Sequence, residues 1–389
     1  MIYRANSVKK SMLVGFSSLF LLFSCQEVKD SDKKTGSHNP EQKTPTNPEK
    51  NGEKVLTKEE REAHQLSAGF KNLRNTCFAN AATTLLFEIP GISDLISDEL
   101  TQRIGEPENE FESRKKLRRA TNALFETRRD PKNDTSSFTS LVNTYFDQIG
   151  EINALTSSTN SPNVGGADGA LLRRDQGDSA DFINELMAYL DFPISGWFQK
   201  MTFDDGSTQI SDSNGKIVNL SLASTLNTQD QARSMQDILN IATSREDYVD
   251  ENMRRAPDGT LRPGQALRAF DSQPKWTIFN LTRFTYNTET NTSSKVFSIV
   301  NPTKKLTIPY FTDLSLQEPD ATMELELKAI TVHSGSTLNG GHYYAYVYNK
   351  NLNKWIKYND SSVSLVKEEI VMTDSKKNGY QFLYINSNP

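Results

Sequence analysis

The alternation of apolar and polar positions divides the chain into three kinds of segment. A mostly apolar run covers residues 12–23, and a polar stretch with almost no apolar side chain follows over about 26–58. Beyond it, residues 111–127 and 138–149 repeat apolar positions with the helical period, and later segments are β-prone. The pattern predicts one folded region over about 59–389, with helices first and strands afterwards.

The sharpest helical signal begins at Cys77. Apolar residues recur from there along one helical face, at Phe78, Ala82, Leu85, Leu86 and Ile89. Asn75 and Thr76 are N-cap residue types, so Cys77 is predicted in the first turn, where the helix dipole favours a thiolate. Asn72 can fold back beside the thiol, and its amide, with the backbone N–H of Cys77, can donate to an oxyanion. A buried cysteine on a capped helix is the alternative interpretation.

A second group of polar residues occurs near the C-terminus. The chain is predicted to form a strand over 324–332, a glycine-rich polar loop over 333–341 and a hairpin over 342–360. In such a hairpin, Asn359 or Asp360 can lie across from His342. An acceptor on one imidazole nitrogen fixes the tautomer and directs the other nitrogen at a thiol. The order Cys, His, Asn is that of papain-like thiol hydrolases.

Composition narrows the possible chemistry. The 389 residues are 35% hydrophobic and 9% aromatic, enough to fill a large core, and the net charge of −5 argues against a nucleic-acid partner. The only cysteines are Cys25 and Cys77. Two cysteines exclude a disulfide framework and a Cys₄ zinc site, and we expect neither a metal nor a cofactor.

The N-terminus is predicted to direct export. Basic residues precede the apolar run, which is short for a membrane span and typical of a signal peptide. The run ends in Leu-Phe-Ser-Cys, similar to a bacterial lipobox. We therefore expect residues 1–25 to be a signal peptide, Cys25 to carry a membrane anchor, and 26–58 to be a flexible tether. An uncleaved membrane anchor, or a signal peptide without lipidation, is the alternative.

Several segments, in order from about Gly69 to Ile385, resemble the ubiquitin-specific protease family. Residues 72–80, NLRNTCFAN, resemble its cysteine box, and residues 333–366, which include GHYYAY and ND, resemble its histidine box. Between them, residues 176–182, QGDSADF, resemble its QQDAxEF element. Shorter segments resemble family strands: NLSL at 219–222, WTIFNLTRF at 276–284 and GYQFLY at 379–384. Each match is weak alone, and together they are specific.

The resemblance implies a papain-like α+β fold and hydrolysis of (iso)peptide bonds at the C-terminal glycine of ubiquitin. A helical lobe would span about 59–190 and an antiparallel β lobe about 195–386. Cys77 becomes the nucleophile and His342 the general base and then acid. Asn359 would orient His342, and Asn72 falls on the oxyanion position. Asp360 is the neighbour that can share the role of Asn359, or it can instead hold the imidazolium electrostatically or bind the oxyanion loop near Asn72. The residues placed along the ubiquitin tail are Gln176, Asp178, His333, Gly340 and Gly341.

The sequence departs from the family pattern at several places. Arg74 replaces the glycine of the cysteine box, and Gly177 replaces the second glutamine of QQD. Residues 197–222 contain no cysteine, so the zinc-binding fingers are expected to be absent or reduced to a metal-free β-hairpin. Residues 246–264 are expected to form a polar loop.

Three functions compete at this point. The first is an active ubiquitin hydrolase, favoured because every catalytic residue type is present. The others are a catalytically weakened ubiquitin-binding protein and an exported cell-wall thiol peptidase, which has no use for QGDSADF. An export signal on a domain with a eukaryotic substrate predicts a host-directed effector, held at the bacterial envelope or secreted into a host cell.

Overall fold

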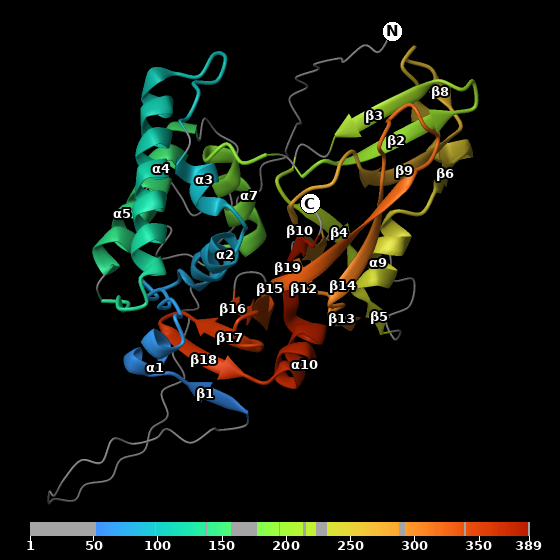
Figure 1. Ribbon diagram of the computed structural model, residues 1–389. Coiled ribbons are helices and arrows are strands. Elements are labelled where there is room, and N and C mark those ends of the chain that lie inside the picture. The colour runs from blue at the N-terminus through green and yellow to red at the C-terminus, as the bar shows by residue number, and fades with distance from the viewer. Residues whose placement is uncertain are drawn as a thin grey trace, which may run out of the picture.

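The computed structural model describes residues 52–97, 99–136, 138–156, 177–193, 195–212, 215–222, 232–287, 292–337 and 340–387. The expected signal peptide, Cys25, most of the tether and Gln176 lie outside these residues. Helices gather in one lobe and strands in the other, so the α+β architecture is confirmed (Figure 1). Within the described residues, none of the helices combines the length and apolar character needed to cross a bilayer.

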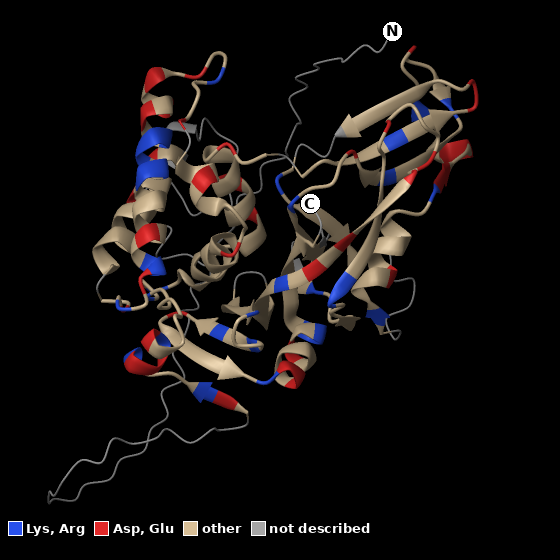
Figure 2. Ribbon diagram, in the orientation of Figure 1, with Lys and Arg blue, Asp and Glu red and all other residues tan. Residues whose placement is uncertain are grey.

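The helical lobe is built around two long antiparallel neighbours. Its helices are α1 (Lys58–Ala63), α2 (Cys77–Phe87), α3 (Ile92–Ser97), α4 (Glu108–Arg129), α5 (Thr139–Thr156) and α7 (Ser179–Tyr189). The helices expected at 111–127 and 138–149 are confirmed as α4 and α5, which pack together. Glutamates in the first turn of α4 and arginines in its last turn complement the helix dipole. Elsewhere Lys and Arg are interspersed with Asp and Glu on both lobes (Figure 2).

Helix α2 lies at the centre of the molecule. The sequence predicted that it would bury one apolar face, and this prediction is wrong because the helix is buried on all sides. Every residue from Cys77 to Leu86 is buried. The reason is that α2 packs against α7 and also against strands β15 (Ala321–Thr337) and β16 (Gly340–Asn349). Its polar residues find partners inside; Thr83 Oγ1, for example, lies 3.3 Å from Tyr145 Oη. Helix α2 therefore carries Cys77 into the contact between the two lobes.

A large, mainly antiparallel sheet forms the β lobe. Its further strands are β1 (Glu53–Val55), β2 (Trp197–Phe203), β3 (Thr208–Asp212), β4 (Val218–Ser221), β6 (Glu246–Tyr248), β9 (Gly264–Phe270), β10 (Trp276–Thr282), β14 (Lys305–Tyr310), β17 (Lys354–Asn359), β18 (Ser362–Val366) and β19 (Gly379–Asn386). The main strand order is β1-β18-β17-β16-β15-β14-β9-β2-β3, and β10 joins through β19 and carries β4 in parallel. Helices α9 (Met235–Ala242) and α10 (Glu368–Asn378) pack against this lobe.

Strand β15 is longer than the sequence suggested. The expected loop over 333–341 is mostly strand, because β15 continues to Thr337 and β16 already begins at Gly340. His333 is therefore a buried strand residue rather than a loop residue. The hairpin of β16 and β17 is confirmed, with Ala345 opposite Tyr358.

One end of the β lobe projects from the molecule (Figure 1). The hairpin expected in place of zinc-binding fingers is formed by β2 and β3, and β9 adds an antiparallel third strand. The loop expected over 246–264 instead contains β6 and the short strands β7 (Arg254–Arg255) and β8 (Leu261–Arg262). Among the described residues, no three His, Cys, Asp or Glu side chains come close enough to hold a metal ion.

The folded part begins earlier than the expected tether boundary at residue 58. Strand β1 pairs antiparallel with β18, and the following Leu56 is buried. Thr57 then starts α1 with a capping box, in which its side chain and that of Glu60 each bind the other's backbone N–H. The sequence did not predict β1, because a strand of three residues is stabilised by pairing with its partner strand and has too few residues to show an apolar pattern.

Candidate active site

Residues 69–76 form a loop that leads into α2 and positions Cys77. A Cβ on Gly69 would lie 2.0 Å from the carbonyl oxygen of Asp360, so only glycine allows the loop to approach the turn after β17 so closely. Thr76 was expected to cap α2, but it makes no cap hydrogen bond; its Oγ1 accepts the N–H of Leu73 at 2.9 Å. The loop is thus closed on itself, and Cys77 starts the helix with none of its surface exposed.

His342 lies on β16, the strand against which α2 packs. Its Nε2 is 2.5 Å from Oδ1 of Asn359, across the β16–β17 hairpin. An amide oxygen only accepts, so this contact places the proton on Nε2 and leaves Nδ1 as the basic nitrogen. The structure therefore brings together the elements that carry Cys77, His342 and Asn359, as the sequence predicted.

Asp360 links the same elements in a different way. Its Oδ2 accepts the side-chain amide of Asn72 at 3.0 Å, and its Oδ1 accepts that of Asn80 at 2.7 Å. The same Oδ2 is 3.9 Å from Nε2 of His342, beyond hydrogen-bond distance. Asn359 and Asp360 were both candidates for orienting His342. In the structure Asn359 contacts the imidazole, whereas Asp360 orients Asn72.

Asp178 starts helix α7 as its N-cap. Its Oδ1 accepts the backbone N–H groups of Ala180 at 2.6 Å and Asp181 at 3.3 Å, and its Oδ2 accepts Tyr380 Oη at 2.5 Å. Burial raises the pKa of Asp178, and these hydrogen bonds act in the opposite direction. The carboxylate is thus held by the fold, and its contact with a substrate stays a prediction.

Three of the residues expected along the ubiquitin tail, His333, Gly340 and Gly341, meet where β15 and β16 join. His333 is fully buried, between the rings of Phe284 and Tyr343. Burial and the nearby Lys295 lower the pKa of His333 to about 3, so this histidine is neutral at physiological pH. A Cβ on Gly341 would lie 2.7 Å from His333 Nε2, which shows how closely the glycine backbone packs on this ring.

The departure at Gly177 has a local explanation. A Cβ at this position would lie 2.8 Å from the ring of Phe78, the residue after the candidate nucleophile. The ring occupies the space that a glutamine side chain would need. Sequence inspection did not connect these two residues because nearly one hundred positions separate them.

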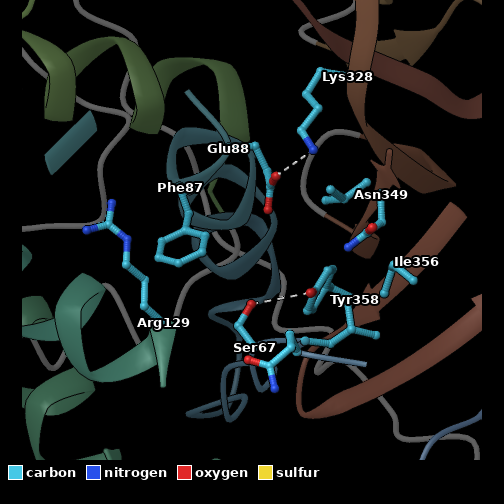
Figure 3. Close-up of a pocket in the computed structure, with 11 residues that line it drawn as sticks. Ser67, Phe87, Glu88, Arg129, Lys328, Asn349, Ile356 and Tyr358 are labelled. Atoms are coloured by element: carbon cyan, nitrogen blue, oxygen red, sulfur yellow. Dashed lines mark hydrogen bonds and ion pairs between the residues drawn. The ribbon is translucent and has the colours of Figure 1, made fainter. Parts of the chain in front are cut away.

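A cavity of about 210 Å³ lies beside β17 (Figure 3). Its lining polar groups already have partners: Ser67 Oγ lies 3.3 Å from Tyr358 Oη, and Lys328 pairs with Glu88 at 3.0 Å. None of the candidate catalytic residues lines it. The cavity is therefore separate from the candidate active site, although Tyr358 directly precedes Asn359.

Arg74 gives a test of backbone strain in the nucleophile loop. Its φ of 90° lies in the region that favours glycine. Such a conformation costs a side-chain-bearing residue on the order of 1–2 kcal/mol. We expect Arg74→Gly to raise the free energy of unfolding by about 0.5–1 kcal/mol after the entropy gain of the unfolded chain. Arg74→Ala is the matched control, because it removes the guanidinium and keeps the Cβ. Equal stabilities of the two variants in urea titrations would contradict the strain.

Asn359 and Asp360 should be distinguishable by comparing activity with stability. We expect Asn359→Ala to lower kcat/KM by ~10–10³-fold, because His342 loses the acceptor that orients it. Asp360→Ala should cost a comparable or smaller factor. It should also lower the free energy of unfolding by about 1–3 kcal/mol, because the amides of Asn72 and Asn80 lose a shared acceptor. If Asn359→Ala keeps full activity while Asp360→Ala is inactive but as stable as wild type, then Asp360 and not Asn359 orients His342.

The fold and the arrangement of Cys77, His342 and Asn359 are similar to those of papain-like thiol hydrolases. The family model of the ubiquitin carboxyl-terminal hydrolases matches residues 68–384, which is most of the chain. The protein therefore belongs to the ubiquitin carboxyl-terminal hydrolase family.

Known relatives match mainly in short segments. Human ubiquitin carboxyl-terminal hydrolase 37 is 38% identical over 60 residues, and human ubiquitin carboxyl-terminal hydrolase 28 is 43% identical over 65 residues. Each match covers 15% of this chain and 6% of the human protein. Ubiquitin hydrolase B of Dictyostelium discoideum is 28% identical over 116 residues, covering 30% of this chain and 24% of that protein.

The similarity in structure is broader. The SAGA Ubp8/Sgf11/Sus1/Sgf73 DUB module bound to ubiquitin aldehyde superposes with a TM-score of 0.61 at 15% sequence identity. The match covers 84% of this chain and 71% of the other. At this identity the likeness establishes the fold, which is the papain-like α+β fold that the sequence predicted.

Proposed function

We propose that the protein is a thiol-dependent deubiquitinase that hydrolyses peptide and isopeptide bonds at the C-terminal glycine of ubiquitin. The contact between His342 Nε2 and Asn359 Oδ1, on the strand that packs against the helix starting at Cys77, carries this proposal. Family membership and a relative bound to ubiquitin aldehyde support the same substrate.

The reaction follows from the proton positions of this group. Sγ of Cys77 attacks the carbonyl carbon of the scissile bond while its proton passes to Nδ1 of His342. The carbonyl π electrons move to oxygen, and their return breaks the C–N bond as His342 protonates the leaving nitrogen. A water molecule that His342 deprotonates then attacks the thioester carbon, the C–S bond breaks, and His342 returns the proton to Sγ of Cys77. Asn359 holds the ring orientation through both steps.

Two groups are assigned as donors to the oxyanion: the side-chain amide of Asn72, in the loop before α2, and the backbone N–H of Cys77, at the start of α2. Nδ2 of Asn72 carries two hydrogens, and Asp360 accepts one of them. The other is assigned to the oxyanion, together with the backbone N–H of Cys77. The Thr76 N–H bond to Oδ1 of Asn72, at 3.2 Å, further restricts rotation of the amide. Asp360 and Thr76 thus preorganise the donor before the substrate binds.

The start of α7 offers negative charge to a cationic tail. Asp181 follows the N-cap Asp178, and Glu185 lies one turn later on the same helix. Burial, and then the negative charge of Asp178 and Glu185, raise the pKa of Asp181. A nearby cation relieves this repulsion, which suits the arginine-bearing tail of ubiquitin. The sequence reasoning did not single out Asp181, although it occupies the acidic position of the QQDAxEF-like element.

The cellular setting is also a proposal. The export-like N-terminus and a domain whose relatives are eukaryotic together support a host-directed effector of a host-associated bacterium, anchored through Cys25 or delivered into host cells. Fractionation should recover the protein with the bacterial envelope or in host extracts. Recovery only from the bacterial cytoplasm would contradict this setting.

Hydrolysis of a fluorogenic ubiquitin C-terminal amide tests the proposed activity. We expect saturable release of the fluorophore by the wild-type protein. A catalytically weakened ubiquitin-binding protein is the second candidate, favoured by the strained backbone at Arg74. Binding of ubiquitin without release of the fluorophore would support that candidate and overturn the proposed hydrolysis.

A further inference from the structure

Lys295 is a buried cation that the proposed mechanism does not use. It ends strand β12 (Thr292–Lys295), which pairs with β11 (Phe284–Asn287) and lies against β15. Only 6% of Lys295 is exposed. Removing an ammonium group from water is costly unless its N–H groups find acceptors, so the identity of those acceptors shows what the residue holds.

The acceptors are neutral and come mainly from one end of β15. Nζ of Lys295 donates to the carbonyl oxygens of His333 at 2.5 Å and Gly335 at 3.1 Å. Nδ1 of His333 is 3.3 Å away, and Oδ1 of Asn378 is 3.4 Å away on α10. Hydrogen bonds from a charged donor are about twice as strong as neutral ones, so Lys295 fixes the backbone at His333 and Gly335.

These two carbonyls flank an irregular place in the β15–β16 ladder. Ser334, between them, is the partner of His342, and the register shifts between Ser334 and Thr337. A bulge leaves backbone groups without ladder partners. Lys295 supplies donors to the last paired residue before Ser334 and to Gly335, which lies inside the register shift.

The backbone held by Lys295 also packs against the glycines of the expected tail channel. A Cβ on Gly335 would lie 2.7 Å from the carbonyl oxygen of Gly340. One on Gly341 would lie 2.7 Å from Nε2 of His333. With contacts this close, a shift of Gly335 or His333 displaces Gly340 and Gly341 as well.

We propose that Lys295 is a positioning residue that fixes the β15–β16 junction so that Gly340 and Gly341 receive the substrate tail. The proposal rests on the proposed deubiquitinase function. It assigns Lys295 to substrate binding through the backbone and not to the chemical step.

The charge of Lys295 should make this positioning sensitive to alkaline pH. Burial, assisted by Arg283, lowers the pKa of Lys295 to about 8, and Asp374 opposes this shift. The charged or titratable groups that face it are His333 on β15, Arg283 after β10 and Asp374 on α10. His333 stays neutral and arginine stays charged over the range of interest, so loss of the Lys295 proton is the change expected near pH 8.

Lys295→Met tests the proposal, because it keeps the length of the side chain and removes the donors. With a fluorogenic ubiquitin C-terminal amide, we expect KM to rise ~10-fold or more while kcat changes by less than ~3-fold. The rate at which iodoacetamide alkylates Cys77 should stay within ~2-fold of wild type. Lys200→Met is the matched control: Lys200 is also buried and donates to the carbonyls of Leu314 and Leu316, and this variant should retain KM.

The outcomes separate a positioning role from a structural one. An unchanged KM in Lys295→Met overturns the proposal. A rise in KM that is accompanied by equally large falls in kcat and in the alkylation rate also overturns it. Wild-type protein provides a second test that needs no variant: KM should rise between pH 7.5 and 9, and a flat KM overturns the proposal. Lys295→Arg, which stays charged, should remove that pH dependence. Normal alkylation of wild type without ubiquitin turnover would instead refute the proposed function itself.

Discussion

Cys77→Ala should abolish hydrolysis of ubiquitin substrates, with kcat/KM falling to background, a loss of ~10⁴-fold or more. The reason is that Cys77 is the only thiol in residues 59–389 and starts the helix that packs against the strand of His342. Its side chain is fully buried and small, so its removal leaves little empty space and should lower the free energy of unfolding by only about 1 kcal/mol.

Stability and binding measurements separate loss of chemistry from loss of fold in this variant. Cys77→Ala should unfold within a few degrees of wild type and should still bind ubiquitin. Turnover that persists in Cys77→Ala would end the thiol-hydrolase account, because no other thiol in the folded region could replace the nucleophile.

His342→Ala should lower kcat/KM by ~10³-fold or more, because both proton transfers lose their carrier. His333→Ala should cost much less. His333 is fully buried, and its pKa of about 3 keeps it neutral, so it does not exchange protons during turnover. His64, at the end of α1, offers a second comparison, and His64→Ala should retain wild-type activity.

Parallel kinetic measurements on the three histidine variants decide the assignment of the base. A loss in His333→Ala as large as that in His342→Ala, with the fold intact by circular dichroism, would mean that the base was wrongly assigned. A near-normal rate in His342→Ala would contradict the role that its contact with Asn359 suggests.

The sequence predicted the parts of the site that depend on local pattern. The helix that begins at Cys77 and the hairpin that carries His342 and Asn359 follow from periodicity, cap residues and turn residues. The resemblance to a known family supplied the pairing of these distant segments, which local pattern does not contain.

Features that depend on long-range partners could not be predicted in this way. Helix α2 is buried on all sides because polar residues such as Thr83 find partners far away in the chain. Strand β1 exists through its pairing with β18. The alternative in which Asp360 binds the loop near Asn72 is confirmed, whereas its second partner, Asn80, lies 280 positions upstream and was not predicted. Lys295 showed no pattern in the sequence, because its importance comes only from the carbonyls around it.

The most direct test of the central claim is reaction with ubiquitin that carries an electrophile at its C-terminus. The account predicts that wild-type protein forms a covalent adduct one ubiquitin larger, that mass spectrometry places the bond on Cys77, and that Cys77→Ala forms none. His342→Ala should react much more slowly than wild type. Wild-type protein that iodoacetamide alkylates at Cys77, but that forms no adduct with the ubiquitin probe, would contradict the account.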